Sequence, residues 1–167
     1  VRNCWFKNIS ADTIEREAIR INMLYHGGDR APAQKVDAGT PVIGDLYYEN
    51  ISCDYSKRNT IQIVGIPEMP VNNVTLKNIT IGGSKGIEIS DAKNIILNNL
   101  SISNEKGPFT KISYSDSISV SNIEIVATDE NEVPFIMNDV VNSSLKNVRY
   151  NLKGDLVHVS GYSENIT

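Results

Sequence analysis

The chain has 167 residues, of which 40% are hydrophobic and 22% are charged, a balance that predicts one globular domain rather than a disordered chain. Its formal net charge of −4 disfavours nucleic acid or an anionic membrane as a partner. No apolar run reaches the roughly 20 residues that span a bilayer. The two histidines, His26 and His158, have no neighbouring cysteines that would indicate a zinc site. We therefore expect a domain that needs neither a metal nor a cofactor.

A short motif with two asparagines recurs along the chain. Its clearest copies, at 73–81 and 94–102, read Asn, apolar, any, apolar, any, Asn, apolar, any, apolar. In chain order the copies start near residues 3, 45, 73, 94, 117 and 142, and 165–167 begins another. The second Asn of the six copies falls at residues 8, 50, 78, 99, 122 and 147. The intervals between them are 42, 28, 21, 23 and 25 residues, so the first repeat contains an insertion.

A second alternating run lies within each repeat. These runs are, in chain order, 18–23, 60–64, 86–90, 109–113, 133–137 and 156–160. Alternation with Ile and Val enrichment is the period-two signal of a strand, whereas helical spacing is not sustained anywhere. A repeat this short cannot bury its apolar residues alone and must stack on its neighbours. Residues 1–167 are therefore predicted to form one all-β domain, a right-handed parallel β-helix of about six coils. A leucine-rich repeat is disfavoured because its Leu-x-x-Leu-x-Leu frame is missing.

Stacked coils bring equivalent positions of successive repeats into rows about 4.8 Å apart. The second Asn of each repeat is predicted to form a row at a turn, where side-chain amides bond one coil to the next. An aliphatic row inside it should consist of Ile79, Leu100, Ile123 and Val148. The same register separates Cys4 from Cys53 by seven positions, roughly 20 Å along a strand, too far for a disulfide. We expect two buried free thiols.

Three segments resemble glycoside hydrolase family 28, the polygalacturonases and their exo-acting relatives. Residues 39–52 begin with Gly-Thr-Pro and end with Asn-Ile-Ser, and residues 63–79 contain Pro-Glu-Met-Pro followed by the Asn repeat. Upstream, residues 18–25 resemble the strand ending in Tyr that precedes a long loop in this family. The resemblance covers roughly residues 1–125, in the order of the C-terminal half of such enzymes.

The resemblance implies inverting hydrolysis of α-linked galacturonides by two carboxyl groups about 6.5–9.5 Å apart. The family's signatures Asn-Thr-Asp, Asp-Asp, Gly-His-Gly and Arg-Ile-Lys are all missing from this sequence, and Arg20-Ile21-Asn22 is only a coincidental approach to the last. We therefore expect the C-terminal β-helix part of a pectin-degrading enzyme, inactive by itself. The alternative is a stand-alone non-catalytic β-helix for carbohydrate binding or assembly. The resemblance also implies a pectic polysaccharide or oligogalacturonide as partner and a secreted or periplasmic location.

The candidate substrate-binding residues are Tyr25, His26 and Arg20, and no catalytic residue is assigned. By resemblance, Tyr25 matches an aromatic position that contacts the sugar; an ordinary turn tyrosine is the alternative. His26 could bond a uronate carboxylate or be an idle loop histidine. Arg20 lies in mid-strand, where it could pair with a galacturonate carboxylate or simply be solvated. The long loop 26–41, with Asp29, Arg30 and Lys35, is expected to form a wall of the cleft.

The first and last repeats show no polar segment of the kind that caps natural solenoids. Strand edges and apolar rows should therefore be open at the ends of the stack. We expect end-to-end self-association, or a folded-back segment that covers at least one end.

Overall fold

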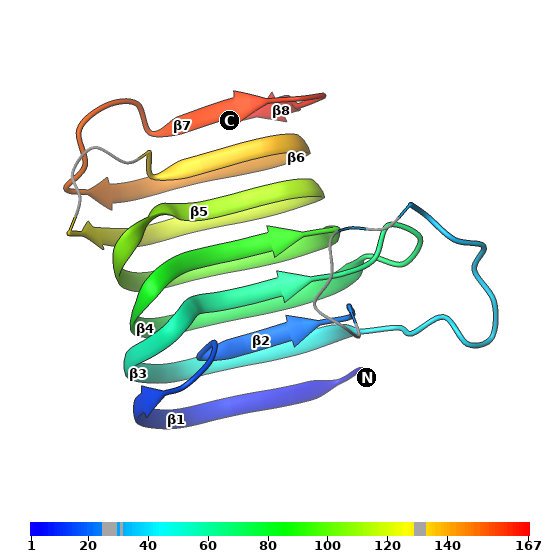
Figure 1. Cartoon of the computed structure of the whole chain (residues 1–167), viewed down its shortest axis with the longest axis horizontal. Coiled ribbons are helices and arrows are strands. Elements are labelled where there is room, and N and C mark those ends of the chain that lie inside the picture. Colours follow the sequence, from blue (N-terminus) through cyan, green and yellow to red (C-terminus); the bar gives the residue numbers. More distant parts are fainter. Residues whose placement is uncertain (25–29, 31, 129–132) are drawn as a thin grey trace.

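The computed structural model describes residues 1–24, 30, 32–128 and 133–167. All of its regular structure is strand, and the strands pair in parallel in the order β1-β3-β4-β5-β6-β7, with β2 also on β3 and β8 also on β6. The strands are β1 (Cys4–Ile14), β2 (Ile19–Asn22), β3 (Gly44–Val64), β4 (Val71–Ser90), β5 (Ala92–Ala127), β6 (Phe135–Tyr150), β7 (Val157–Ser160) and β8 (Glu164–Ile166). They wind into a stack of coils (Figure 1), a β-solenoid of about five turns. The predicted parallel β-helix is confirmed.

The long strands bend where the repeat places its two marker residues. At the second marker the backbone is left-handed in every copy, with φ between 52° and 57° from Asn8 to Asn147. The first marker shares this conformation, including Asp45 and Ser117, where φ is 53° and 60°. Asn and Asp tolerate the left-handed region better than other residues with a side chain. The asparagines are therefore the corners of the coil.

The row of side-chain amides at the second marker is present as predicted at four of its five steps, and among the described residues only the step from Asn122 to Asn99 has no such bond. Each bond runs from an Asn Nδ2 to the Asn Oδ1 of the preceding coil, so the row has a direction. These bonds are Asn50 to Asn8 (2.9 Å), Asn78 to Asn50 (2.9 Å), Asn99 to Asn78 (2.8 Å) and Asn147 to Asn122 (3.1 Å). One residue type thus supplies both the turn and the bond that fixes the next coil on it.

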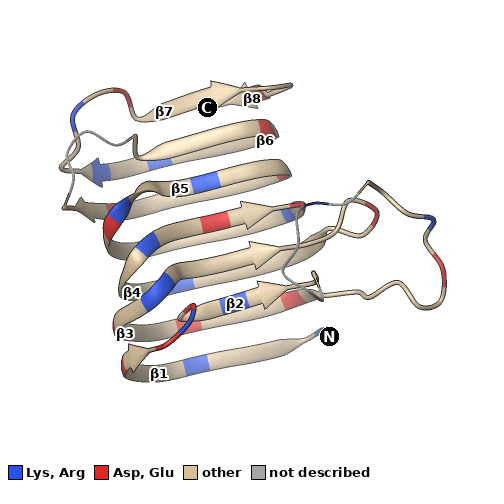
Figure 2. Ribbon diagram, in the orientation of Figure 1, with Lys and Arg blue, Asp and Glu red and all other residues tan. Residues whose placement is uncertain are grey.

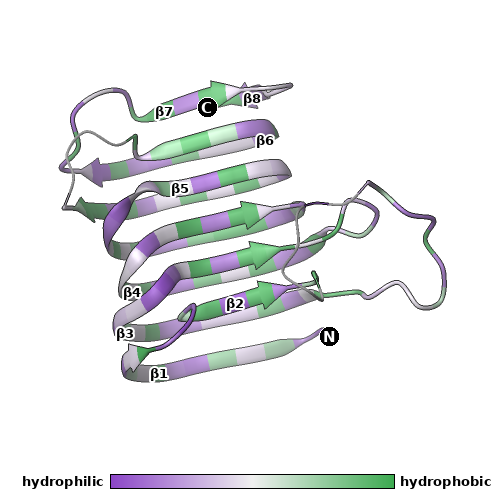
Figure 3. Ribbon diagram, viewed as in Figure 1, coloured by the Kyte–Doolittle hydropathy of each residue, from purple (hydrophilic) through white to green (hydrophobic). Residues whose placement is uncertain are grey.

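The inner side of each coil is apolar, and its residues stack into continuous rows. Ile79, Leu100 and Ile123 are almost fully buried, and Val148 packs against them from the last complete coil, which confirms the predicted aliphatic row. Figure 3 shows the alternation of apolar and polar positions along the strands. Burial of each such side chain contributes roughly 1.5–3 kcal/mol. Because the coils are thin, this packing between coils is the main source of stability.

The register of β1 on β3 also determines how far apart the two cysteines lie. Cys53 lies opposite Ala11, seven positions along β1 from Cys4, and both thiols are free. Cys53 is buried, and this burial raises the pKa of its thiol. The expectation of a second buried thiol is wrong, because Cys4 is only partly covered. Cys4 belongs to β1, which pairs with β3 on one side and with no strand of the described residues on the other.

The extra length of the first repeat lies between β2 and β3. In Figure 1 the described part of this connection, residues 32–43, lies beside the stack and returns to it near the N-terminal end. On the return, the N-terminal amine of Val1 donates to the carbonyl oxygen of Val42 at 2.7 Å. The insertion therefore widens one side of the stack and leaves the coils in register.

We expect Asn78→Ala to destabilise the domain by about 2–3 kcal/mol. The substitution removes the bonds to Asn50 and from Asn99, each worth about 1 kcal/mol, and places a Cβ-bearing residue without a side-chain amide at a positive φ. Asn78→Gly loses the same bonds without that backbone penalty and should be about 1 kcal/mol more stable than Asn78→Ala. Urea unfolding followed by circular dichroism measures both changes. Equal stability of the two variants would contradict the role of the left-handed turn.

Candidate functional site

One outward position of the second run in each repeat forms a row along the stack. The register places Arg20 beside Gln62, Gln62 beside Glu88, and Glu88 beside Lys111. Ile136 and the exposed His158 continue the row on β6 and β7. Neighbouring members stand about 4.8 Å apart. Charged bands of both signs therefore cross the face formed by β2, β3, β4 and β5 (Figure 2).

A groove of about 470 Å³ lies over this face. Its floor contains Asn22, Gln62 and Glu88, and Leu24 and Arg30 stand beside it. Asn22 Nδ2 donates to Gln62 Oε1 at 3.1 Å, and Gln62 Nε2 donates to Glu88 Oε2 at 2.8 Å. These bonds run from coil to coil and fix the amide and the carboxylate in the floor. The groove consequently follows the axis of the stack across several coils.

Three arginines surround one buried carboxylate at the β2 end of the groove. The Nε atoms of Arg16 and Arg20 each lie 3.7 Å from Glu17 Oε2, and Nη1 of Arg58 lies 3.9 Å from Glu17 Oε1. The side chain of Glu17 is 5% exposed, while those of Arg16, Arg20 and Arg58 are 55%, 37% and 58% exposed. A single carboxylate therefore anchors three guanidinium groups that face solvent, and two positive charges are left unbalanced.

These ion pairs are longer than hydrogen bonds. Glu17 Oε2 is buried and has no hydrogen-bond partner among the described residues. A guanidinium carries five N–H donors in a planar fork that matches a carboxylate. Because Glu17 does not occupy those donors, Arg16, Arg20 and Arg58 can offer them to an anion in the groove.

The whole groove is positive within an acidic chain. Five basic side chains line it (Arg16, Arg20, Arg30, Arg58 and Lys111) against three acidic ones (Glu17, Glu88 and Asp91). The lining thus carries a formal charge of +2, whereas the chain as a whole carries −4. A concave surface with one sign of charge concentrates ligands of the opposite sign. The groove is therefore suited to a negatively charged ligand.

One arginine of the insertion is fastened to the body of the solenoid. Arg30 Nε and Nη2 donate to Asp91 at 2.9–3.0 Å, and these bonds raise the pKa of Arg30. The Asp91 side chain is only 4% exposed and also accepts a bond from Ser90 Oγ at 3.1 Å. The Arg30 guanidinium lies 3.9 Å from the ring centroid of Tyr114, a cation–π contact. We call the contact between Arg30, Asp91 and Tyr114 the Arg30 clamp.

The sequence-predicted site residues have different outcomes. Arg20 lies in the groove, on an outward position of β2. Arg30 lines the groove beside it, where the insertion was expected to form a wall. Tyr25, His26 and Asp29 fall outside the described residues.

Sequence reasoning missed several members of the groove. Gln62, Glu88 and Lys111 share the repeat position of Arg20, so an alignment of the repeats would have revealed them. Glu17 lies in the connection before β2, and Arg58 lies in β3 where the register shifts between Ser56 and Asn59, so neither follows the pattern of the repeat. Their approach to Arg20 had no signal in the sequence.

The groove can bind an anion, but its acidic groups are engaged. Asp91 is held by Arg30, Glu88 accepts from Gln62, and Glu17 is enclosed by arginines. Within the described residues, no group of three or more His, Cys, Asp or Glu side chains is placed to hold a metal ion. The same residues form no helix with the length and apolar character that a membrane crossing requires. The chemistry offered is electrostatic and hydrogen-bonded recognition.

Comparison of the chain with models of known protein families, with curated proteins and with solved structures gives no match. The groove therefore has to be interpreted from its own residues.

Asp91→Asn should loosen the connection between β2 and β3. The substitution removes the charge that holds Arg30, and loss of a charged bond worth about 1.5–3 kcal/mol corresponds to at least tenfold more frequent local opening. Limited trypsin digestion, followed by mass spectrometry, should show cleavage after the exposed Lys35 about ten times faster than in the unmodified protein. Asp116→Asn removes the same charge from a site paired with Lys93 and should leave this rate unchanged. Equal rates in all three proteins would show that the clamp does not hold the insertion.

Proposed function

We propose that this chain is the C-terminal β-helix part of a pectin-degrading glycoside hydrolase, and that its groove holds the acidic sugar chain. The observation that carries this proposal is the cluster of Arg16, Arg20 and Arg58 around Glu17. It offers unbalanced positive charge and free guanidinium donors on the face of the solenoid. The cluster does not stabilise the fold of this acidic chain, because burial of a carboxylate whose Oε2 accepts no hydrogen bond costs free energy. Binding of an anion is its best physical explanation.

A polyuronate fits the groove better than a single small anion. Two cationic side chains of the row, Arg20 on β2 and Lys111 on β5, lie three coils apart. This is a separation of roughly 14 Å along the stack. A chain of linked uronic acids carries a carboxylate on every ring and can reach both. Between them, Asn22, Gln62 and Ser113 offer amide and hydroxyl groups to sugar hydroxyls. The sequence resemblance to glycoside hydrolase family 28 supports galacturonate as the acidic sugar and a secreted or periplasmic location.

The catalytic step is assigned to residues that this chain does not contain. None of the four family signatures occurs in the 167 residues, and the groove carboxylates are engaged by other side chains. A stand-alone β-helix that binds carbohydrate without cleaving it is the second candidate, favoured by the same two observations. The two candidates share the groove and differ in whether catalytic coils accompany it in the natural protein.

Binding of tetragalacturonate should depend on the arginine cluster. Arg20→Ala and Arg58→Ala should each raise the dissociation constant about tenfold, because a charged hydrogen bond is worth roughly 1.5–3 kcal/mol. Affinity should also fall as salt is raised. Isothermal titration calorimetry measures these constants. Arg149→Ala, an exposed arginine on β6 away from the groove, is the matched control, and maltotetraose is the neutral ligand of equal length. Equal affinity for both oligosaccharides would refute recognition of the acidic sugar.

The isolated chain should release no galacturonic acid from polygalacturonate, because the three carboxyl groups described in its groove, Glu17, Glu88 and Asp91, are each engaged by other side chains and do not form a free pair for general acid and base catalysis. A reducing-sugar assay over a day at several pH values measures this. Turnover above the rate of a heat-inactivated sample would overturn the assignment of catalysis to other residues.

A further inference from the structure

Tyr114 in β5 has a backbone conformation that is unusual for a bulky residue. Its φ is 49°, in the left-handed region, and every other described non-glycine residue with a positive φ is an asparagine, an aspartate or a serine. Asparagine and aspartate enter this region readily because their short polar side chains can hydrogen-bond locally. A tyrosine has no such compensation, so the left-handed conformation at Tyr114 is strained.

The same corner of the neighbouring coils holds residues that suit the turn. The register of β5 on β4 and β6 aligns Tyr114 with Asp91 in the preceding coil and with Asp139 in the next, where φ is 47° and 56°. Gly161 follows at this corner after β7, with φ 65°. An aspartate or a glycine would therefore serve the fold better than a tyrosine. A residue that breaks the local rule of a repeat is expected where a functional site requires it.

The position of Tyr114 is in the lining of the groove. Tyr114 is 43% exposed and lies three residues beyond Lys111 in the same coil. Arg20 lies three coils away, roughly 14 Å along the stack. The arginine cluster and Tyr114 therefore stand at opposite ends of the groove, where they can contact different rings of one sugar chain.

The Arg30 clamp fixes a cation against the tyrosine ring. The Arg30 guanidinium lies 3.9 Å from the ring centroid of Tyr114, and its Nε and Nη2 atoms are held by the almost fully buried Asp91. Arg30 Nη1 makes no hydrogen bond within the described residues and can donate to a carboxylate. The ring and the cation are thus ordered before a ligand binds, which lowers the entropy lost on binding.

We propose that Tyr114 and Arg30 form a subsite for one uronate ring of the acidic chain, an inference that rests on the proposed function of the groove. A uronate ring has C–H groups on its face and a carboxylate at its edge. The tyrosine ring packs against the C–H groups, and Arg30 Nη1 donates to the carboxylate. An aspartate at this corner would keep the turn but would repel the uronate. The strained tyrosine is therefore a specificity-determining residue.

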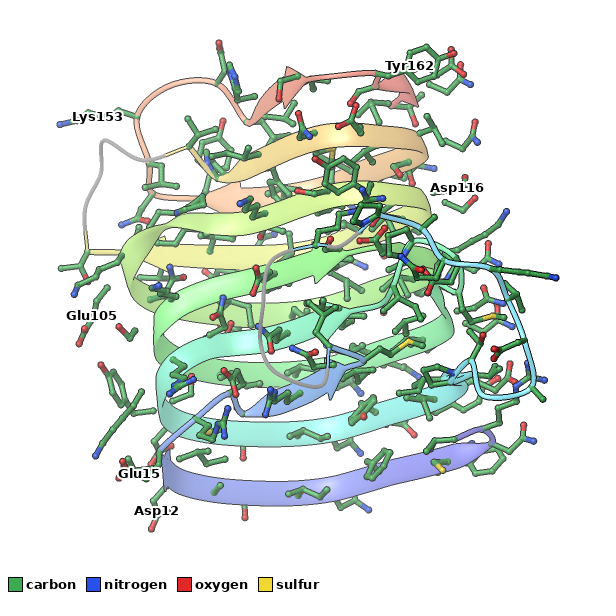
Figure 4. The ribbon with its side chains drawn as sticks, turned by 45° about the vertical axis from the view of Figure 1, so that its right-hand side comes forward. Asp12, Glu15, Glu105, Asp116, Lys153 and Tyr162 are labelled. Atoms are coloured by element: carbon green, nitrogen blue, oxygen red, sulfur yellow. The ribbon has the colours of Figure 1, made fainter. Side chains whose placement is uncertain are left out.

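Tyr114→Asn tests the subsite because it removes the ring and leaves a residue that suits the turn. Its affinity for tetragalacturonate should fall about fivefold, while its urea midpoint should equal or exceed that of the unmodified protein. Tyr114→Phe keeps the ring and should bind within about twofold of the unmodified protein. Tyr162→Asn is the matched control, since Tyr162 is exposed at the far end of the stack beside β8 (Figure 4) and should change neither quantity. Calorimetric titration and urea unfolding measure them.

Salt separates contact with the ring from an effect of charge. The weakening caused by Arg20→Ala should shrink as salt is raised, whereas the weakening caused by Tyr114→Asn should persist. If both shrank alike, Tyr114 would act only through the charge of Arg30, and direct contact with the sugar would be overturned.

The remaining outcomes separate the subsite from the function of the groove. Normal affinity of Tyr114→Asn beside weak binding by Arg20→Ala would overturn the subsite alone. A lower urea midpoint of Tyr114→Asn would show that the tyrosine serves the fold, and would also overturn the subsite. If the unmodified protein bound no tetragalacturonate, the proposed function would fail and the subsite with it.

Discussion

The structure depends on asparagine, which both bends the strand and bonds to a neighbouring coil at the corners of the solenoid. An asparagine with φ near 55° bends the strand, and its amide bonds to the equivalent asparagine of the preceding coil. The bend brings an apolar row inside, and the bond fixes each coil in register on the last. The left-handed turn bends the strand, and the amide bond adds a contact between neighbouring coils to the backbone pairing. Burial of the aliphatic rows follows from this geometry and contributes most of the free energy of folding.

Strict register explains how the groove can be specific without disturbing the fold. Inward positions are restricted to residues that fit the row above and below, while outward positions are free to vary. Arg20, Gln62, Glu88 and Lys111 occupy the same outward position in four coils and differ in charge. The fold therefore tolerates any sequence of charges along this face. A ligand that is itself a repeating polymer is well matched to such a row, since it can present a group to each of several coils.

The groove and the β1 end use the solenoid in different ways. In the groove, side chains from turns and from the insertion meet over a finished sheet surface, and the Arg30 clamp fixes one of them. At the β1 end, β1 pairs with β3 on one side and with no other strand of the described residues. The groove suits an anionic ligand that contacts side chains.

The sequence alone determined the architecture, because each coil repeats the same local pattern of asparagine and alternating apolar residues. The asparagine spacing predicted the corners, the alternation at residues such as Ile79 and Leu100 predicted the core, and the register excluded a disulfide between Cys4 and Cys53. It identified Arg20 from its outward position in a strand. Only the tertiary structure decided which side chains join it. Glu17 and Asp91 come from connections between strands and Arg58 from an irregular stretch of β3. Stacking brings Arg58 to Glu17 and Asp91 to Arg30 although these segments are far apart in the chain. Local periodicity fixes the rows, but contacts between turns depend on the path of the whole chain.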